Sequence, residues 1–130
     1  MNADNKVKFG AARCCEELTT ALLVHMSVPT VTEAVAGAIR SISVNDDNEV
    51  KFGAARCCEE LTTALRVHMS VPTVTQKVAN AMMNICVNNA AHKAKFKSLG
   101  VAALVDSALS LHQSNASLQA DLRDLKSRFA

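Results

Sequence analysis

The stretch KFGAARCCEELTTAL occurs twice in this chain, at residues 8–22 and again at residues 51–65. It belongs to a longer duplication, because residues 5–47 align without a gap on residues 48–90 and 32 of the 43 positions are identical. A third, divergent copy follows at a spacing of 44 residues. Periods of this size are typical of solenoid units built from two or three helices.

Apolar residues recur at helical spacing within each copy. In copy one they form two stripes, Cys14, Leu18, Ala21, Leu22 and His25, then Val31, Val35, Ala38, Ile39 and Ile42. The sequence predicts three helices per copy. In copy two these are a short helix at residues 48–52, a second at about 54–68 and a third at about 74–87.

Residues between the predicted helices suit caps and turns. Thr30-x-x-Glu33 and Thr73-x-x-Gln76 are predicted capping boxes at the start of the third helix, and Ser117 takes the same cap position in copy three. Pro29 and Pro72 lie just before these caps, where a missing N–H costs little. The turn that opens the next copy is predicted at Asn45, Asp46, Asp47, Asn88 and Asn89.

Composition supports a helical, single-domain protein. Hydrophobic residues make up 49% of the 130 residues, whereas the chain has only four Gly and two Pro. Its net charge of +2 is too small to argue for a nucleic-acid partner. The five cysteines include two adjacent pairs, which does not fit a secreted disulfide framework. With no signal pattern and no bilayer-spanning apolar run, we expect a reduced cytoplasmic protein, with the nucleus as the alternative.

The third-helix segments AGAIRSIS (36–43) and ANAMMNIC (79–86) resemble the Ala-x-Ala-Leu-x-Asn-Leu pattern of the armadillo repeat family, and an Asn or Asp turn follows both. The resemblance implies an all-α, right-handed superhelical solenoid of about three armadillo-like three-helix repeats. It forms one domain, 1–130, with repeats at about 5–47, 48–91 and 92–130. Arg13 and Arg56 occupy a place where the family usually has Gly, which only Gly100 keeps. We therefore expect the first two helices of copies one and two to run on with a shallower bend.

Cysteine pairs and aligned histidines are the candidates for chemistry. Adjacent cysteines on a helix point about 100° apart, so a pair seldom reaches one metal, and Cys14 and Cys57 lie on the apolar stripe. We interpret them as small buried hydrophobes, and a redox or metal role is the alternative. His25, His68 and His112 each close a predicted helix. Neighbouring helices pack about 8–10 Å apart, too far to share a zinc bonded at about 2 Å, so we interpret them as helix caps.

No catalytic constellation is found. The carboxylate pairs Glu16-Glu17 and Glu59-Glu60 have no companion base, and the chain carries no phosphate loop, zinc-binding His-Glu-x-x-His run or nucleophile elbow. We expect a non-enzymatic protein with no cofactor, no metal site and no small-molecule substrate.

The two best copies differ mainly in their third helices. Nine of fifteen positions differ between residues 33–47 and 76–90, but only two positions differ upstream. Third helices of a solenoid line a concave groove, and altered groove residues on an unchanged scaffold would read an extended ligand. The predicted groove residues are Glu33, Arg40, Ser41, Gln76, Lys77, Asn80, Met83, Asn84, Asp124 and Arg128. The alternative is drift at solvent positions, although Glu59, Glu60, Thr62 and Thr63 should also be solvated and are unchanged.

The armadillo resemblance places Asn84 at the family's groove asparagine, which holds the backbone of a bound extended peptide. Ser41 and Arg128 hold that position in the other copies. Arg40, Lys77 and Arg128 together suggest a ligand with some acidic character.

Nuclear-import adaptors of the same family keep Trp where this chain has Gly37, Asn80 and Asp124. Since this chain has no Trp, recognition of basic import signals in that manner is not expected. We expect a protein-interaction scaffold that binds an extended peptide or a partner helix along the groove, with no nucleic-acid or membrane partner.

The alternative function is a structural segment that assembles with copies of itself. The chain opens in a turn between repeats and ends at the last core position of copy three, and neither end shows a clear polar cap. The sequence therefore predicts a fragment of a longer array, or self-association through uncapped terminal repeats.

Overall fold

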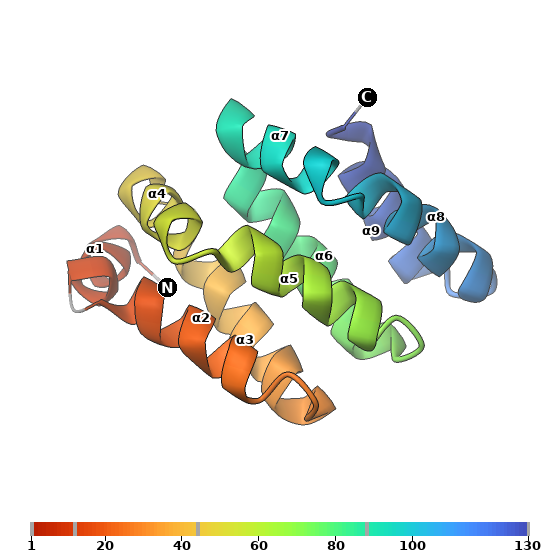
Figure 1. The fold of residues 1–130 in the computed structure, drawn as a ribbon, viewed down its shortest axis with the longest axis horizontal. Coiled ribbons are helices and arrows are strands. Elements are labelled where there is room, and N and C mark those ends of the chain that lie inside the picture. Colours follow the sequence, from red (N-terminus) through yellow and green to blue (C-terminus); the bar gives the residue numbers. More distant parts are fainter. Residues whose placement is uncertain (1, 12, 44, 88, 130) are drawn as a thin grey trace.

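The structure is a computed structural model that describes residues 2–11, 13–43, 45–87 and 89–129. Within these residues the fold is all-α, with nine helices and no strand, which confirms the predicted fold class at that level (Figure 1). The helices are α1 (Ala3–Ala11), α2 (Cys14–Val24), α3 (Pro29–Ile42), α4 (Asp46–Ala54), α5 (Cys57–Val67), α6 (Pro72–Cys86), α7 (Ala90–Ser98), α8 (Val101–Leu111) and α9 (Ala116–Ser127).

The helices follow one another as three triplets, which we name the first (α1–α3), second (α4–α6) and third (α7–α9) triplet. Each triplet opens with a helix of 9 residues and continues with one of 11 residues. Figure 1 shows α2, α5 and α8 side by side in one row, with α3, α6 and α9 forming a second row behind them. The second triplet therefore lies between the other two, and α6 packs on both α3 and α9.

A left-handed residue separates the first two helices of every triplet. Arg13 has φ 63°, Arg56 has φ 66° and Gly100 has φ 80°, and each is the N-cap of the helix that follows. The expected shallower bend at the two arginines is therefore wrong. A residue other than glycine costs about 1–2 kcal/mol in this conformation, so the packing of the flanking helices must hold the arginines there.

The third helices of the first two triplets begin at proline, without the predicted capping boxes. Pro29 and Pro72 are the first residues of α3 and α6, and the N-cap residues before them are valines, whose side chains accept no hydrogen bond. The caps predicted at Thr30 and Thr73 are therefore wrong. Proline takes their role in a different way, because its fixed φ suits the first helical position and its missing N–H needs no partner.

Asparagine caps open the first helix of the second and third triplets. Asn45 and Asn89 each accept a hydrogen bond from the backbone N–H three residues on, at 3.1 Å and 2.9 Å, as the sequence predicts. Asn88 lies outside the described residues. Asn115 caps α9 in the same way at 3.1 Å, so the cap predicted at Ser117 is wrong.

Two of the three aligned histidines link consecutive triplets. His25, His68 and His112 are the C-cap residues of α2, α5 and α8, which confirms their predicted place at the helix ends. The ring Nε2 of His68 donates to Met26 O at 2.6 Å, and that of His112 donates to Met69 O at 2.7 Å. Each ring thus ties its triplet to the loop of the preceding one, a bond that helical spacing alone does not predict.

The C-terminal end of the fold is polar. Three positions that are buried in copy two, Thr62, Ala79 and Met82, align with the exposed Asp106, Arg123 and Lys126 of copy three. Lys126 Nζ lies 2.6 Å from Asp106 Oδ1, which joins α9 to α8 across the surface. The expectation that neither end carries a polar cap is therefore wrong for this end.

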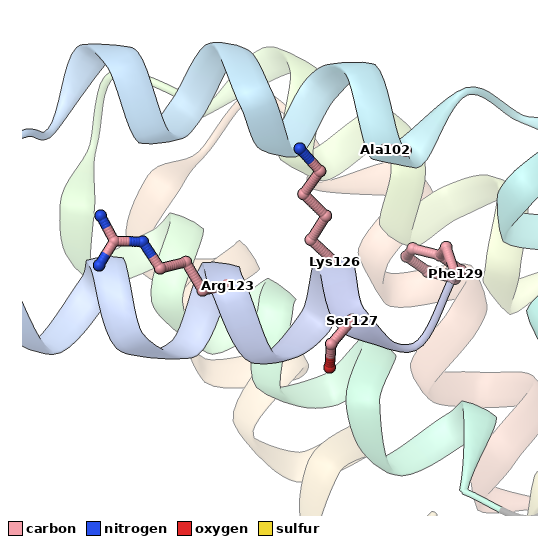
Figure 2. A pocket seen from close by; sticks show the side chains of 5 residues that line it. All are labelled: Ala102, Arg123, Lys126, Ser127 and Phe129. Carbon is pink, nitrogen blue, oxygen red and sulfur yellow. The ribbon is translucent and has the colours of Figure 1, made fainter.

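A shallow hollow of about 370 Å³ lies on this C-terminal surface, between α8 and α9 (Figure 2). Ala102 lines it from α8, while Arg123, Lys126 and Ser127 line it from α9 and Phe129 from the residues just beyond α9. The ring of Phe129 also meets Phe96 edge-on, with centroids 6.4 Å apart.

Candidate protein-interaction face

Five of the predicted groove residues lie on one face of α6. Gln76, Lys77, Asn80, Met83 and Asn84 fall at intervals of one, three and four residues, and each is half-buried. Every other position of α6 from 74 to 86 is buried. The helix therefore presents these five side chains outward and uses the rest of its surface for packing.

The other five predicted residues lie on the helices that flank α6. Glu33 is half-buried and Arg40 and Ser41 are exposed on α3, while Asp124 is exposed on α9 and Arg128, its C-cap, is half-buried. Because α6 packs on both α3 and α9, the structure brings the ten residues onto one row of helices. We name these ten residues the third-helix face.

Polar contacts cross this face from helix to helix. Asn84 Nδ2 donates to Arg40 O at 2.9 Å, which ties α6 to α3. Gln76 Nε2 donates to Asp121 Oδ2 at 2.8 Å and to Ser117 Oγ at 2.9 Å, which ties α6 to α9. The amide of Asn84 has two N–H donors and an acceptor oxygen, so after this bond it can still offer one N–H and its carbonyl to a ligand.

Sequence reasoning missed Ser117 and Asp121 as members of this contact. The signal for them was present, because at the spacing of 44 residues Ser117 aligns with Thr73 and Asp121 aligns with Lys77. Their cross-helix role could not be read from the alignment, since it depends on which side chain α6 places opposite them.

The charge of the face is mixed. Arg128 Nε lies 3.7 Å from Asp124 Oδ1, so part of its charge is balanced within α9. Arg40 is exposed and Lys77 is half-buried on the neighbouring helices. The basic character predicted from three residues therefore rests mainly on Arg40 and Lys77.

Exposure alone does not explain where the two copies differ. Between residues 5–47 and 48–90, seven positions outside the third-helix face are exposed in both copies and yet carry identical residues in both. They are Val7 and Val50, Ala11 and Ala54, Arg13 and Arg56, Val24 and Val67, Ser27 and Ser70, Pro29 and Pro72, and Thr30 and Thr73. Five of the eleven differences between the copies lie instead on the outward side of the third helices.

The unchanged residues of the second helix have a packing explanation. Thr62 is buried, and its Oγ1 donates to Cys58 O at 2.8 Å. Glu59, Glu60 and Thr63 are half-buried. The expectation that all four are solvated is therefore wrong, and their identity in the two copies carries no argument about function.

The cysteines are free thiols and are packed mainly in the core. Cys15, Cys57, Cys58 and Cys86 are buried and Cys14 is half-buried, so both members of the second pair are covered. Burial raises the pKa of Cys15 to about 11 and that of Cys58 to about 12. Since the thiolate is the reactive form, these thiols are poor nucleophiles near neutral pH.

Within the described ranges, no three His, Cys, Asp or Glu side chains cluster so that they could hold a metal ion. In the same part of the chain, no helix has both the length and the apolar character needed to cross a bilayer. Comparison with protein-family models, curated proteins and solved structures found no match.

Proposed function

We propose that this chain is a right-handed, armadillo-like helical solenoid that acts as a non-enzymatic protein-interaction module. Its third-helix face would bind an extended peptide or a partner helix. The succession of three similar helix triplets and the period of 43 to 44 residues support the solenoid architecture.

The distribution of differences between the copies carries the proposal. A scaffold that only drifts would vary at solvent positions wherever they lie, yet seven exposed positions elsewhere are identical in the two copies. The outward positions of α6 carry Gln, Lys, Asn, Met and Asn where α3 carries Glu, Ala, Gly, Arg and Ser. Such variation on a constant scaffold lets successive units contact different parts of one ligand.

The side chains on the face suit a peptide ligand. Asn80 and Asn84 lie one helical turn apart on α6, and amides can pair with both the N–H and the C=O of an extended backbone. Met83 lies between them in sequence and supplies an adaptable apolar contact. Arg40 and Lys77 favour a ligand that carries an acidic side chain nearby.

Head-to-tail self-assembly, the alternative from the sequence, would have to bury the charged C-terminal end. Arg123 and the ion pair between Lys126 and Asp106 are exposed there, and taking charged groups out of water costs several kcal/mol per ion. This cost favours the interaction module over a segment that assembles with its own kind.

Selection of binders from a random peptide display library, followed by fluorescence anisotropy, tests the proposal. We expect the double variant Asn80→Ala and Asn84→Ala to bind a selected peptide at least about tenfold more weakly, a loss of about 1.4 kcal/mol. The matched control is Ser27→Ala with Ser70→Ala, two exposed positions off the face. Equal affinity of the double-Asn variant and the control would refute the assignment, provided that urea unfolding shows both to be folded.

A further inference from the structure

The first triplet exposes an apolar surface that the second triplet buries. The surface consists of six residues, Phe9, Cys14, Leu18, Ala21, Val31 and Ala38, which we name the N-terminal face. Phe9 is 42% exposed and the other five are half-buried. In copy two, the residue 43 positions later is identical in every case and is at most 1% exposed.

The equivalent residues of the second triplet are buried because the first triplet covers them. Helices α1, α2 and α3 pack on α4, α5 and α6, respectively. Cys57 of α5, for example, is 0% exposed, whereas its counterpart Cys14 in α2 is half-buried. The covering surface of the first triplet is small and aliphatic, with Cys15, Leu22, Ala36 and Ile39 all at 0% exposure.

The N-terminal face is also hollowed. A pocket of about 100 Å³ is lined by Phe9, Cys14, Leu18, Ala38 and Ile42, and so gathers four of the six residues. The second triplet shows which chemistry covers such a face. There the same six residue types are buried under a triplet whose Cys15, Leu22, Ala36 and Ile39 are themselves fully buried.

A second folded molecule of this chain does not offer such a covering surface. The covering surfaces of its first two triplets are buried against the next triplet. Its third triplet carries Arg123 and Lys126 where the first has Ala36 and Ile39, and Asp106 where the first has Thr19. Docking there would desolvate Arg123 and the ion pair between Lys126 and Asp106 against an apolar surface.

We propose that the N-terminal face is a docking surface for another three-helix unit, one whose facing side has the small, aliphatic chemistry of Cys15, Leu22, Ala36 and Ile39. The unit docks in the register in which the first triplet covers the second. This partner is distinct from any ligand of the third-helix face, because it packs on α1, α2 and α3 at the end of the two rows of helices, as the first triplet packs on the second.

Changing the C-terminal end of the full chain tests the proposal. The triple variant Asp106→Thr, Arg123→Ala and Lys126→Met gives the third triplet the residues that copy two has at these positions. We expect the wild type to sediment as a monomer and the triple variant to form head-to-tail assemblies whose mass rises several-fold with concentration.

A block and its matched control locate the contact. Adding Leu18→Asp to the triple variant should restore the monomer, whereas adding Leu23→Asp should not. Leu23 lies on the same helix but is 57% exposed, and copy two has Arg66 at its position. A folded triple variant that stays monomeric overturns the proposal. A wild-type dimer that Leu18→Asp abolishes also overturns it, because the occupant would then be a second molecule of this chain.

A thiol measurement gives the answer if the triple variant does not fold. In a chain in which a further copy of residues 5–47 replaces residues 1–4, the added copy carries Cys14→Val and Cys15→Ala, as in copy three. We expect the original Cys14 to react with a thiol reagent at least about tenfold more slowly than in the wild type, because the added triplet would have to undock before the reagent could reach this thiol. An unchanged rate in the folded, extended chain would overturn the proposal.

Discussion

Phe9 and Phe52 lie at the same place in identical stretches of sequence, but their replacement by alanine should have very different costs. Phe52 is 0% exposed and Phe9 is 42% exposed. Truncation of a buried Phe to Ala costs about 3–5 kcal/mol, which includes the cavity left behind. Full burial of a Phe side chain contributes a transfer free energy of roughly 2 kcal/mol, and Phe9 gains only about six-tenths of it. Water can also fill the space that its ring would leave. We therefore expect Phe9→Ala to cost about 1 kcal/mol.

The matched pair removes effects that usually confuse such comparisons. The residues flanking the two Phe are the same from Lys8 to Leu22 and from Lys51 to Leu65, so local helix propensity and the unfolded state are nearly equal. The assay is urea unfolding followed by circular dichroism, and the two variants are compared by their free energies of unfolding once their m-values are shown to be equal. A difference of less than about 1 kcal/mol between the variants would refute the burial argument. Leu18 and Leu61 provide a second pair with the same expected order.

Three other substitutions test single features by the same unfolding assay. Arg56→Gly should stabilise the protein by up to about 1 kcal/mol by relieving the left-handed strain, whereas Arg56→Ala should not; equal effects would argue against strain. Burial raises the pKa of Cys86 to about 11 from its ordinary value of 9.0. Between these two values the thiol keeps its proton in the folded state and loses it in the unfolded state. The free energy of unfolding should therefore fall as pH rises from about 9 to 11. Cys86→Ser, the residue of copy one, should remove about 1 kcal/mol of that fall by pH 10, and an unaltered pH slope would contradict it. His68→Ala should lower the free energy of unfolding by about 1–3 kcal/mol, because Met26 O loses its hydrogen-bond donor. His25→Ala should cost less than half as much, because the His25 side chain is exposed. Similar costs would show that the bond between the triplets contributes little.

Local features of the fold were predictable from the sequence. The spacing of the apolar residues predicts the helices. The caps at Asn45 and Asn89 are predictable because a short asparagine side chain can accept a hydrogen bond from the backbone N–H three residues on. The outward face of α6 was also predictable, because a stripe of polar residues opposite a buried stripe needs only the helical period.

Features that depend on competing local options were predicted wrongly. Thr30 and Thr73 are good capping residues, but the prolines before them begin the helix one position earlier. Arg13 and Arg56 have no intrinsic preference for positive φ, and only the packing of the flanking helices places them there.

By itself, the sequence determined that the chain is helical, where its turns fall and which side of each third helix faces outward, because these properties arise from residues within a few positions of one another. Only the tertiary structure decided what each copy of KFGAARCCEELTTAL does. The stretch at 51–65 is buried between two triplets, whereas the stretch at 8–22 leaves Phe9 and Leu18 on an open surface. The letters are identical, so the difference comes from the neighbours: burial depends on what packs against a residue, and the first triplet has nothing in this structure packed on its N-terminal face within the residues described.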